Sequence, residues 1–401
     1  MKIVVTGASG FVAGLLIPRL LARGADLLLV SRDPVSLKAR FPECLTSSYG
    51  SLAENGLGFD LLVHLAALNN HAAESPQAFA RSNVDHLIAT YRAATEAKIT
   101  RFVDVSTVHA LDQSNLSPYA MSKRAGTHAL SQQYGSVVCT VYLAAVYGEQ
   151  WSGQLSILNY LPHFVAKRIF PVLAAVKPTV HIDRFVDYLL SPAPVADCAL
   201  TDGQLRNPVY RFASRALAFV VGTGILVGFG WALAALWIAV RLGSEGPGIF
   251  SQQRLGKGGR PFICYKFRTM ALGTRHLGTH EVPASAITQL GRKLRVTKLD
   301  ELPQAWNLVR GDMNLVGPRP GLANQTDLAS ARTQAGVLEL VPGITGLAQV
   351  NGIDMSDPER LADWDSRYLA LQSLALDGKL LLATVTGAGR GDPAQQGFSR
   401  L

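Results

Sequence analysis

The sequence predicts two α/β domains joined by a membrane-embedded helical segment. Three observations carry this prediction: a strand, a glycine turn and an apolar helix at the start, 25 consecutive uncharged residues at 216–240, and a strongly basic second half. A chain of 401 residues also exceeds what one ordinary hydrophobic core supports. We therefore expect a Rossmann-like, doubly wound parallel sheet over residues 1–210, a membrane-inserted helical hairpin over 211–245, and a small α/β catalytic domain over 246–401.

The charge of the chain indicates an anionic partner for its second half. Residues 1–210 carry 17 Lys and Arg against 15 Asp and Glu, whereas residues 211–401 carry 21 against 14. Phosphorylated substrates and anionic lipid head groups suit such a surface. Nucleic acid is not expected, because no zinc-finger, helix-turn-helix or aromatic RNA-binding pattern accompanies the charge.

The cysteines and the N-terminus favour a reduced protein that faces the cytosol. The four cysteines are far apart and show no metal-ligand spacing: Cys44, Cys139, Cys198 and Cys264. The chain passes directly from Met1 into a strand, so we expect no signal peptide.

The N-terminal segment has the order of elements that binds a dinucleotide. A buried strand at 2–5 is followed by a glycine turn at 6–13 and an apolar helix, which brings backbone N–H groups to a pyrophosphate. The second strand, at 26–30, ends at Arg32, where the residues that read the adenosine ribose belong. Arg32 suits a 2′-phosphate and favours NADP over NAD; the alternative is a solvated strand end. The expected cofactor contacts are Gly7, Ser9, Gly10, Phe11, Arg32, Ala66 and Lys123.

Three later segments complete a predicted proton-transfer site. The strand at 61–67 ends in small residues that allow close approach to a cofactor, and the strand at 102–107 ends in hydroxyls. Tyr119 and Lys123 lie one helical turn apart on the same face. Lys123 would lower the pKa of the phenol, so that Tyr119 exchanges a proton with a sugar hydroxyl or carbonyl. Thr107 would hydrogen-bond the same oxygen.

Together these elements resemble the extended short-chain dehydrogenase/reductase family of sugar-nucleotide epimerases, dehydratases and reductases, over about residues 1–190. Later landmarks match at Asn83-Val84, Val146-Tyr147-Gly148 and His181-Ile182-Asp183. The resemblance implies a Rossmann fold, a nicotinamide cofactor, and Thr107, Tyr119 and Lys123 as the catalytic set. Tyr142 and Leu143 replace the arginine and proline usual before Val-Tyr-Gly, and the substrate lobe is much reduced. A scaffold-only domain is therefore an alternative.

Residues 216–240 contain no charge and are long enough for a transmembrane helix. Arg211 and Arg215 precede them, while Arg241 and the basic domain follow, so the positive-inside rule gives no sidedness. Because both flanking domains belong in the cytoplasm, we expect a re-entrant hairpin that enters and leaves through one leaflet. A buried helix of a soluble protein is the alternative. Glycines that offer a bend are Gly222, Gly224, Gly228 and Gly230.

The segment after the hairpin is rich in candidate phosphate ligands. Residues 254–298 hold ten Lys and Arg against one acid, Glu281. Such density suits a polyphosphate or a lipid phosphate better than an ordinary solvated face. The candidates for phosphate binding are Arg254, Lys266, Arg268, Arg295 and Arg319.

Two adjacent carboxylates, Asp300 and Glu301, precede a predicted helix. Its apolar positions are Leu302, Ala305, Trp306 and Val309, and Pro303 suits a first helical turn. The helix dipole and nearby cations would keep Asp300 ionised; these cations are Arg292, Arg295 and Lys298. An ionised carboxylate can be a nucleophile or a metal ligand, and the alternative is a helix N-cap with an acidic first turn.

Residues 211–386 resemble the bacterial sugar transferase family, the monotopic phosphoglycosyl transferases. The matching motifs are Gly246-Pro247, Gln253-Arg254-Leu255-Gly256, residues 265–270, 299–304, Gly311-Asp312-Met313, 316–320 and 342–352, with Asp365, Tyr368, Ser373, Asp377 and Thr384 in the tail. The resemblance implies transfer of a sugar 1-phosphate from a UDP-sugar to polyprenyl (undecaprenyl) phosphate with release of UMP. It implies that Asp300 and Glu301 are catalytic residues of this domain. Asp300 would form an acyl phosphate, and Mg²⁺ would bind at Asp300, with Glu301 nearby. The family often has a Ser-Pro break where this chain has Gly230-Trp231.

The two resemblances imply a bifunctional, monotopic enzyme of the bacterial inner membrane with both domains in the cytoplasm. The first domain would reduce a UDP-4-keto-6-deoxy-N-acetylhexosamine with NADPH, and the second would load the product onto the lipid carrier. A UDP-sugar 4-epimerase and a non-catalytic nucleotide-sugar-binding module are the alternatives for the first domain. NAD in place of NADP and a homo-oligomer are left open.

Overall fold

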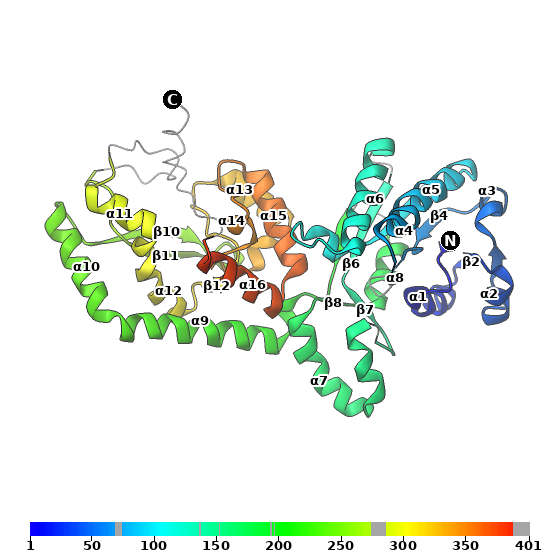
Figure 1. Ribbon diagram of the computed structural model, residues 1–401, viewed down its shortest axis with the longest axis horizontal. Coiled ribbons are helices and arrows are strands. Elements are labelled where there is room, and N and C mark those ends of the chain that lie inside the picture. The colour runs from blue at the N-terminus through cyan, green and yellow to red at the C-terminus, as the bar shows by residue number, and fades with distance from the viewer. Residues whose placement is uncertain are drawn as a thin grey trace. The chain divides into compact units, whose positions relative to one another are not determined.

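The computed structural model describes residues 1–68, 74–135, 138–151, 153–192, 195, 197–273 and 286–387. It consists of two compact units, Met1–Gly203 (unit 1) and Gln204–Leu401 (unit 2) (Figure 1). Glu281, the single acid of the basic segment, lies outside the described residues.

Unit 1 is built on a seven-stranded parallel sheet with the strand order β3-β2-β1-β4-β5-β6-β9. The strands are β1 (Lys2–Thr6), β2 (Asp26–Val30), β3 (Leu45–Ser47), β4 (Leu61–His64), β5 (Arg101–Thr107), β6 (Val138–Leu143) and β9 (Cys198–Leu200). The order reverses between β1 and β4, and in doubly wound sheets the carboxyl ends at such a point form the ligand crevice. The predicted Rossmann-like sheet is therefore confirmed.

The helices of unit 1 cover this sheet, and the apolar strands are buried on both faces, as in other parallel sheets. The α-helices are α1 (Phe11–Ala22), α2 (Pro34–Arg40), α3 (Leu52–Asn55), α4 (Pro76–Ala80), α5 (His86–Glu96), α6 (Pro118–Tyr134), α7 (His163–Val176) and α8 (Ile182–Leu190). A π-turn, η2 (Arg81–Asp85), joins α4 to α5; 3-10 turns are η1 (Tyr49–Ser51), η3 (Val108–Leu111) and η5 (Gly153–Tyr160). A short parallel pair, β7 (Ala145–Tyr147) and β8 (Thr179–His181), flanks η5 and α7.

Unit 2 begins with the 3-10 turn η6 (Gln204–Arg206) and two apolar helices, α9 (Pro208–Gly228) and α10 (Gly230–Gly243). They break at Phe229, whose φ of −113° and ψ of 15° are not helical. Among the described helices, α9 alone is long and apolar enough to cross a membrane, and only 11% of its apolar window is buried. The break lies at the predicted Gly228 and Gly230, without a Ser-Pro pair. Entry and exit through one leaflet stay a prediction.

The rest of unit 2 is a small α/β domain. An antiparallel ribbon, β10 (Ile249–Leu255) and β11 (Pro261–Phe267), is followed by a parallel pair, β12 (Asn314–Val316) and β13 (Gly343–Thr345). The helices are α11 (Gln289–Thr297), α12 (Ala305–Arg310), α13 (Thr326–Gln334), α14 (Leu347–Val350), α15 (Pro358–Leu371) and α16 (Leu374–Val385). The 3-10 turns are η7 (Lys257–Gly259), η10 (Leu299–Gln304) and η11 (Val337–Glu339).

Helix α12 packs directly on α9, and a glycine allows the contact. A Cβ on Gly222 would lie 2.8 Å from the carbonyl oxygen of Ala305. Gly222 is thus a packing residue rather than the predicted bend. The predicted apolar face of α12 is also only partly right: Trp306 is 49% exposed, whereas Asn307 is completely buried.

Candidate active site

The glycine turn of unit 1 lies against the loop that follows β4. Gly7 has a φ of +67°, and a Cβ at this position would lie 2.6 Å from the backbone nitrogen of Ala66. Gly10 is the N-cap of α1 and has no side chain to occupy the first N–H groups of the helix. Ser9 and Phe11 beside it are exposed. We call the backbone of Gly7, Gly10 and Ala66 the cradle; it fits the pyrophosphate of a dinucleotide.

Tyr49 occupies one side of this turn. Its hydroxyl accepts a hydrogen bond of 3.1 Å from the Gly7 N–H, and its ring makes an edge contact with His86. Burial raises the pKa of Tyr49, while the Gly7 N–H and the charge of Arg32 oppose the rise. Arg32 is exposed at the end of β2. The structure therefore brings Arg32 to the cradle together with two aromatic rings that the sequence did not single out.

Tyr119 and Thr107 lie together at the ends of α6 and β5. Helix α6 starts at Pro118, after Ser117 caps it by accepting a hydrogen bond from the Ala120 N–H. Burial raises the pKa of Tyr119, although a hydrogen bond with Thr107 acts in the opposite direction. We expected Lys123 to lower this pKa, and in the structure that expectation is wrong.

Burial is the main cause of the raised pKa of Tyr119, and a carboxylate near Lys123 adds to it. The ammonium of Lys123 donates a hydrogen bond of 2.8 Å to the carbonyl oxygen of Val105, and Asp104 lies close enough to act on its charge. Asp104 is fully buried in β5, and its carboxylate raises the pKa of Tyr119. Sequence reasoning missed Asp104, although a carboxylate inside an apolar strand was a signal.

Asn83 holds the cradle and α6 together. Its side-chain oxygen accepts a hydrogen bond of 2.8 Å from the Leu68 N–H, and its amide nitrogen donates one of 2.9 Å to Oγ of Ser122. The loop that carries Ala66 is thereby fixed relative to the helix that carries Tyr119.

In unit 2, Asp300 and Glu301 lie in the 3-10 turn η10, directly before α12. The chain enters this turn through Lys298, which has a φ of +60°, an unfavourable conformation for a residue with a side chain. Nζ of Lys266, from β11, donates a hydrogen bond of 2.6 Å to Oε1 of Glu301. Burial alone would raise the pKa of Glu301, but Lys266 and Arg319 lower it to about 2.

Asp300 has a different environment. It is 9% exposed, and its Oδ1 atom is buried without a hydrogen-bond partner among the described residues. Burial and the charge of Glu301 raise its pKa to about 6, against the pull of Lys266, Arg295 and Lys298. Of the three cations that we expected here, Arg295 and Lys298 lower this pKa, but desolvation outweighs them. At neutral pH the carboxylate is still mostly ionised.

The candidate phosphate ligands divide into two groups. Lys266, Arg295 and Arg319 act on the charge of the two carboxylates. Arg254 is near Arg319 and Glu301, but its guanidinium donates to Oε1 of Gln252 and to the carbonyl oxygen of Pro320.

Arg268 has a structural position. Its guanidinium donates to Ser244 and to the carbonyl oxygen of Glu245, just after α10. It thus ties the end of α10 to the end of β11.

Two buried side chains hold the backbone segments around this site in place. Neither of them was identified from the sequence. Asn307 donates a hydrogen bond of 2.7 Å to the carbonyl oxygen of Ile263, and its side-chain oxygen accepts from the Tyr265 N–H. Arg332 is ion-paired with Asp365 at 2.7 Å and donates to the carbonyl oxygen of Arg319. These contacts position the ribbon and the Pro-Arg-Pro turn on either side of the two carboxylates.

The described residues contain no group of three or more His, Cys, Asp or Glu side chains that would hold a metal ion. Mg²⁺ is commonly bound by one or two carboxylates together with substrate phosphates. The unpartnered Oδ1 of Asp300 fits such a mode, whereas Glu301 is engaged by Lys266.

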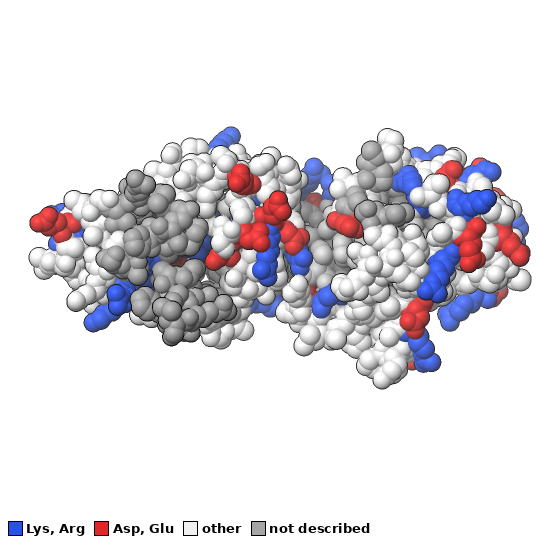
Figure 2. All heavy atoms as spheres, turned by 90° about the horizontal axis from the view of Figure 1, so that it is seen from above, with Lys and Arg blue, Asp and Glu red and all other residues white. Residues whose placement is uncertain are grey.

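A shallow depression of about 930 Å³ lies between α13 and α15, away from η10. It is lined by acidic side chains, among them Asp327, Asp357, Glu359 and Asp363, and Figure 2 shows acidic residues gathered on this part of unit 2. These acidic side chains would repel phosphate, so the depression does not suit a phosphate ligand.

Two family models match the chain: "Bacterial sugar transferase" over residues 209–390, and "NAD dependent epimerase/dehydratase family" over residues 3–170. The UDP-glucose:undecaprenyl-phosphate glucose-1-phosphate transferase of Caulobacter vibrioides is 42% identical over 38% of this chain. The uncharacterized sugar transferase EpsL of Bacillus subtilis is 41% identical over 36% of this chain. This chain spans 60% of the Caulobacter protein and 72% of EpsL.

A solved UDP-glucuronic acid 4-epimerase from Bacillus cereus in complex with NAD is 18% identical to this chain. The TM-score is 0.40, and the match covers 50% of this chain and 77% of the epimerase chain.

Proposed function

The chain belongs to the bacterial sugar transferase family and carries a domain of the NAD dependent epimerase/dehydratase family before it, and we propose that it is a bifunctional enzyme of lipid-linked glycan synthesis. Unit 2 transfers a sugar 1-phosphate from a UDP-sugar to polyprenyl phosphate and releases UMP. Unit 1 prepares the sugar nucleotide that unit 2 uses.

Asp300 is the proposed nucleophile of unit 2. Its carboxylate attacks the phosphorus that adjoins the sugar, the bond to the UMP oxygen breaks, and an acyl phosphate forms. An oxygen of polyprenyl phosphate then attacks the same phosphorus and displaces the carboxylate. The observation that carries this proposal is the buried Oδ1 of Asp300, which has no hydrogen-bond partner in the described part of the chain and lies in a turn whose charge is influenced by several cations. A carboxylate with a raised pKa and no hydrogen bond is a better nucleophile than a solvated one.

The cations around the turn have a matching role. Lys266, Arg295 and Arg319 would bind the diphosphate oxygens and stabilise the charge that passes to UMP. Mg²⁺ bound at Asp300 and at the substrate phosphates would supply further charge neutralisation. Glu301, held by Lys266, orients that ammonium toward the site.

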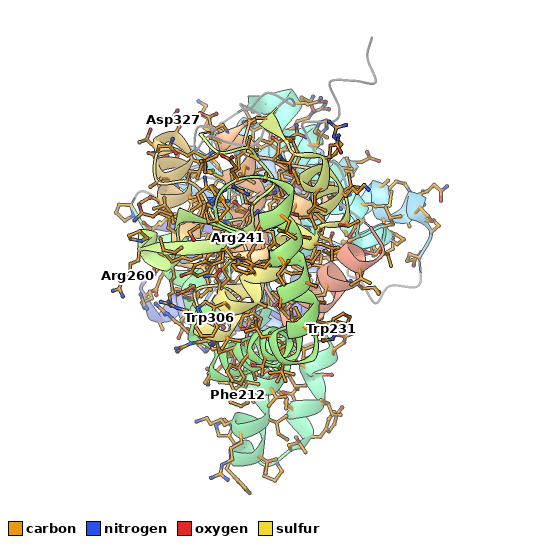
Figure 3. The ribbon with its side chains drawn as sticks, turned by 90° about the vertical axis from the view of Figure 1, so that its left-hand side faces the viewer. Phe212, Trp231, Arg241, Arg260, Trp306 and Asp327 are labelled. Carbon is orange, nitrogen blue, oxygen red and sulfur yellow. The ribbon has the colours of Figure 1, made fainter. Side chains whose placement is uncertain are left out.

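The apolar surface of unit 2 supports attachment to a bilayer. Phe212 and Trp231 of α9 and α10 are 77% and 76% exposed, and Trp306 is 49% exposed. Figure 3 places these three side chains on the lower part of unit 2, with Asp327 at the opposite end. Exposed aromatic and aliphatic residues of this kind belong at a membrane interface. We propose a monotopic protein of the bacterial inner membrane with both units in the cytoplasm.

The test for unit 2 is release of UMP by the purified full-length chain in detergent, with undecaprenyl phosphate, Mg²⁺ and a panel of UDP-sugars. Release that requires the lipid phosphate supports the proposal. A chain that forms no UMP with any sugar, yet still binds lipid vesicles, would be a structural anchor instead.

For unit 1 we propose reduction of a UDP-4-keto-6-deoxy-N-acetylhexosamine by NADPH. Tyr119 would donate the proton to the sugar oxygen, Thr107 would hydrogen-bond that oxygen, and Lys123 would bind the cofactor ribose and hold the phenol in place. The exposed guanidinium of Arg32 beside the cradle supports NADPH.

Oxidation of NADPH in the presence of the 4-keto sugar nucleotide tests this reaction. Interconversion of UDP-GlcNAc and UDP-GalNAc without net oxidation would identify a 4-epimerase instead. If Tyr119→Phe leaves every sugar conversion unchanged while nucleotide sugar still binds, unit 1 is a binding module.

A further inference from the structure

Unit 1 has an exposed apolar surface of its own, formed by the end of η5 and the outer side of α7. We call it the α7 face and define it by Tyr160, Leu161, Phe164, Val172 and Val176. Their exposed fractions run from 36% for Leu161 to 87% for Tyr160. Phe164, Val172 and Val176 are spaced by multiples of four residues, so they share one side of the helix. In Figure 1, α7 extends away from the seven-stranded sheet.

Helix α7 packs on its own unit through Phe170 and Leu173, which lie against the buried cluster around Trp151, but it leaves further large apolar side chains exposed. Its buried residues are three alanines, Ala166, Ala174 and Ala175, whereas Phe164 is 70% and Val172 is 49% exposed. A helix that contacts only its own domain turns its larger apolar side chains inward. The α7 face therefore has the composition of a surface that is covered by something else.

The segment that contains the α7 face carries basic but no acidic residues. Residues 150–182 contain no Asp or Glu, and Lys167 and Arg168 lie exposed on α7 between Phe164 and Val172. Arg168 lies in the same row of the helix as Phe164 and Val172, and Lys167 lies next to this row. Long basic side chains can extend to lipid phosphates while neighbouring apolar residues enter the interface, as in helices that lie in the plane of an anionic membrane surface. In a symmetric contact with a second copy, the same cations would face each other and repel.

We propose that the α7 face lies on the anionic lipid surface and forms a second membrane contact of the chain. The inference rests on the proposed attachment of unit 2, because that attachment keeps unit 1 near the bilayer. Even a weak interfacial contact is then largely occupied, since the local concentration of lipid is high. Unit 1 would be held at the membrane by α7 as well as by its covalent link to α9.

Three matched valine-to-cysteine variants test the proposal in the full-length chain. Val172→Cys reports on the α7 face, Val227→Cys reports on α9, and Val35→Cys, on α2, is a control that is 80% exposed in unit 1. Each is made in a background with Cys139 and Cys198 replaced by serine, and labelled with a fluorophore sensitive to polarity. The protein is reconstituted into vesicles of phosphatidylcholine and phosphatidylglycerol, with or without a lipid that carries a nitroxide quencher near its head group.

We expect strong quenching and a blue shift at residue 172, and neither at residue 35. Replacing phosphatidylglycerol with phosphatidylcholine, or Lys167 and Arg168 with glutamate, should reduce the quenching at 172 several-fold. Quenching at 227 without quenching at 172 would overturn the α7 contact and leave the attachment of unit 2 intact. Quenching at 172 alone would support the α7 contact and contradict the attachment of unit 2. Efficient disulfide formation between two copies through residue 172, without lipid quenching, would assign the face to a dimer and overturn the proposal.

Discussion

Nζ of Lys266 lies 2.6 Å from Oε1 of Glu301, and this contact separates two adjacent carboxylates into different chemical roles. Glu301 is ion-paired and has a pKa of about 2, whereas Asp300 is buried beside that charge and has a pKa of about 6. Titratable neighbours whose pKa values are pushed apart are typical of active sites. This difference supports the proposal that Asp300 is the reactive carboxylate and that Glu301 positions Lys266.

The first prediction is that Asp300→Asn abolishes UMP release and stabilises the fold. The folded-state pKa of Asp300 is above its unfolded value, so the ionised group destabilises the protein fully above about pH 6 and not at all well below pH 4. Removal of this charge should raise stability at pH 8 by up to about 3 kcal/mol. Thermal unfolding in detergent and UMP release measure the two effects. Asp327→Asn, at an exposed position on α13, is the control that should change neither.

The second prediction concerns pH. If Asp300 attacks as the carboxylate, UMP release should fall about tenfold per pH unit below an apparent pKa near 6. Initial rates between pH 5 and pH 8, at UDP-sugar concentrations well below KM, give the profile of kcat/KM, which reports the pKa of the free enzyme. An acid limb near pH 4 would mean that Asp300 is not desolvated in the working enzyme.

The third prediction uses two glycines of α9. A Cβ at residue 222 would lie 2.8 Å from the Ala305 carbonyl oxygen, whereas nothing lies within 4 Å of one at residue 224. Gly222→Ala should therefore push α12 and the adjoining η10 away and reduce both stability and UMP release. Gly224→Ala should be neutral or stabilising by about 0.5 to 1 kcal/mol, because alanine favours the helix. Equal effects of the two variants on thermal unfolding would show that α9 and α12 do not pack as described.

The fourth prediction is that Asn307→Ala destabilises unit 2 by about 2 to 3 kcal/mol. Its side chain is completely buried and joins β11 to α12, so its loss leaves the Ile263 carbonyl and the Tyr265 N–H without a partner. Denaturant unfolding measures the effect. Asn324→Ala, at an exposed position, is the matched control and should be within about 0.5 kcal/mol of the parent chain.

Sequence patterns were sufficient where a local signal dictates the backbone. The glycine turn at Gly7, the parallel order of the large sheet and the position of Asp300 before α12 follow from periodicity and motif order. Contacts between distant segments were not predictable in this way. In the sequence, Asn307 is a polar residue that interrupts the apolar pattern of a helix. Its burial is explained only by its hydrogen bonds to the backbone of residues 263 and 265, which the fold brings next to it.

The roles of individual cations were also beyond the sequence. Lys266 lies near the end of β11 and Arg268 directly follows the strand, yet Arg268 binds carbonyl oxygens after α10 whereas Lys266 binds Glu301. Which of them approaches the carboxylates depends on tertiary packing rather than on residue type.

The last prediction concerns Asp104 behind Lys123. The buried carboxylate raises the pKa of Tyr119, so Asp104→Asn should lower the pKa of that phenol. Ultraviolet titration measures the phenol pKa. The titration of Tyr119 is isolated by subtracting the curve of the Tyr119→Phe variant, once in the parent chain and once in the Asp104→Asn chain, and the two results are compared. Asp26→Asn, at an exposed position in β2, should leave the titration unchanged.

The same substitution should act on stability with a definite sign. Burial raises the pKa of Asp104 above its unfolded value, so any ionised fraction destabilises unit 1 as the pH rises. The asparagine amide cannot ionise and therefore avoids this destabilisation. The stability gained by Asp104→Asn should grow from pH 4 toward neutral pH. An unchanged phenol titration together with lower stability at all pH values would instead make Asp104 a packing residue with no influence on Tyr119.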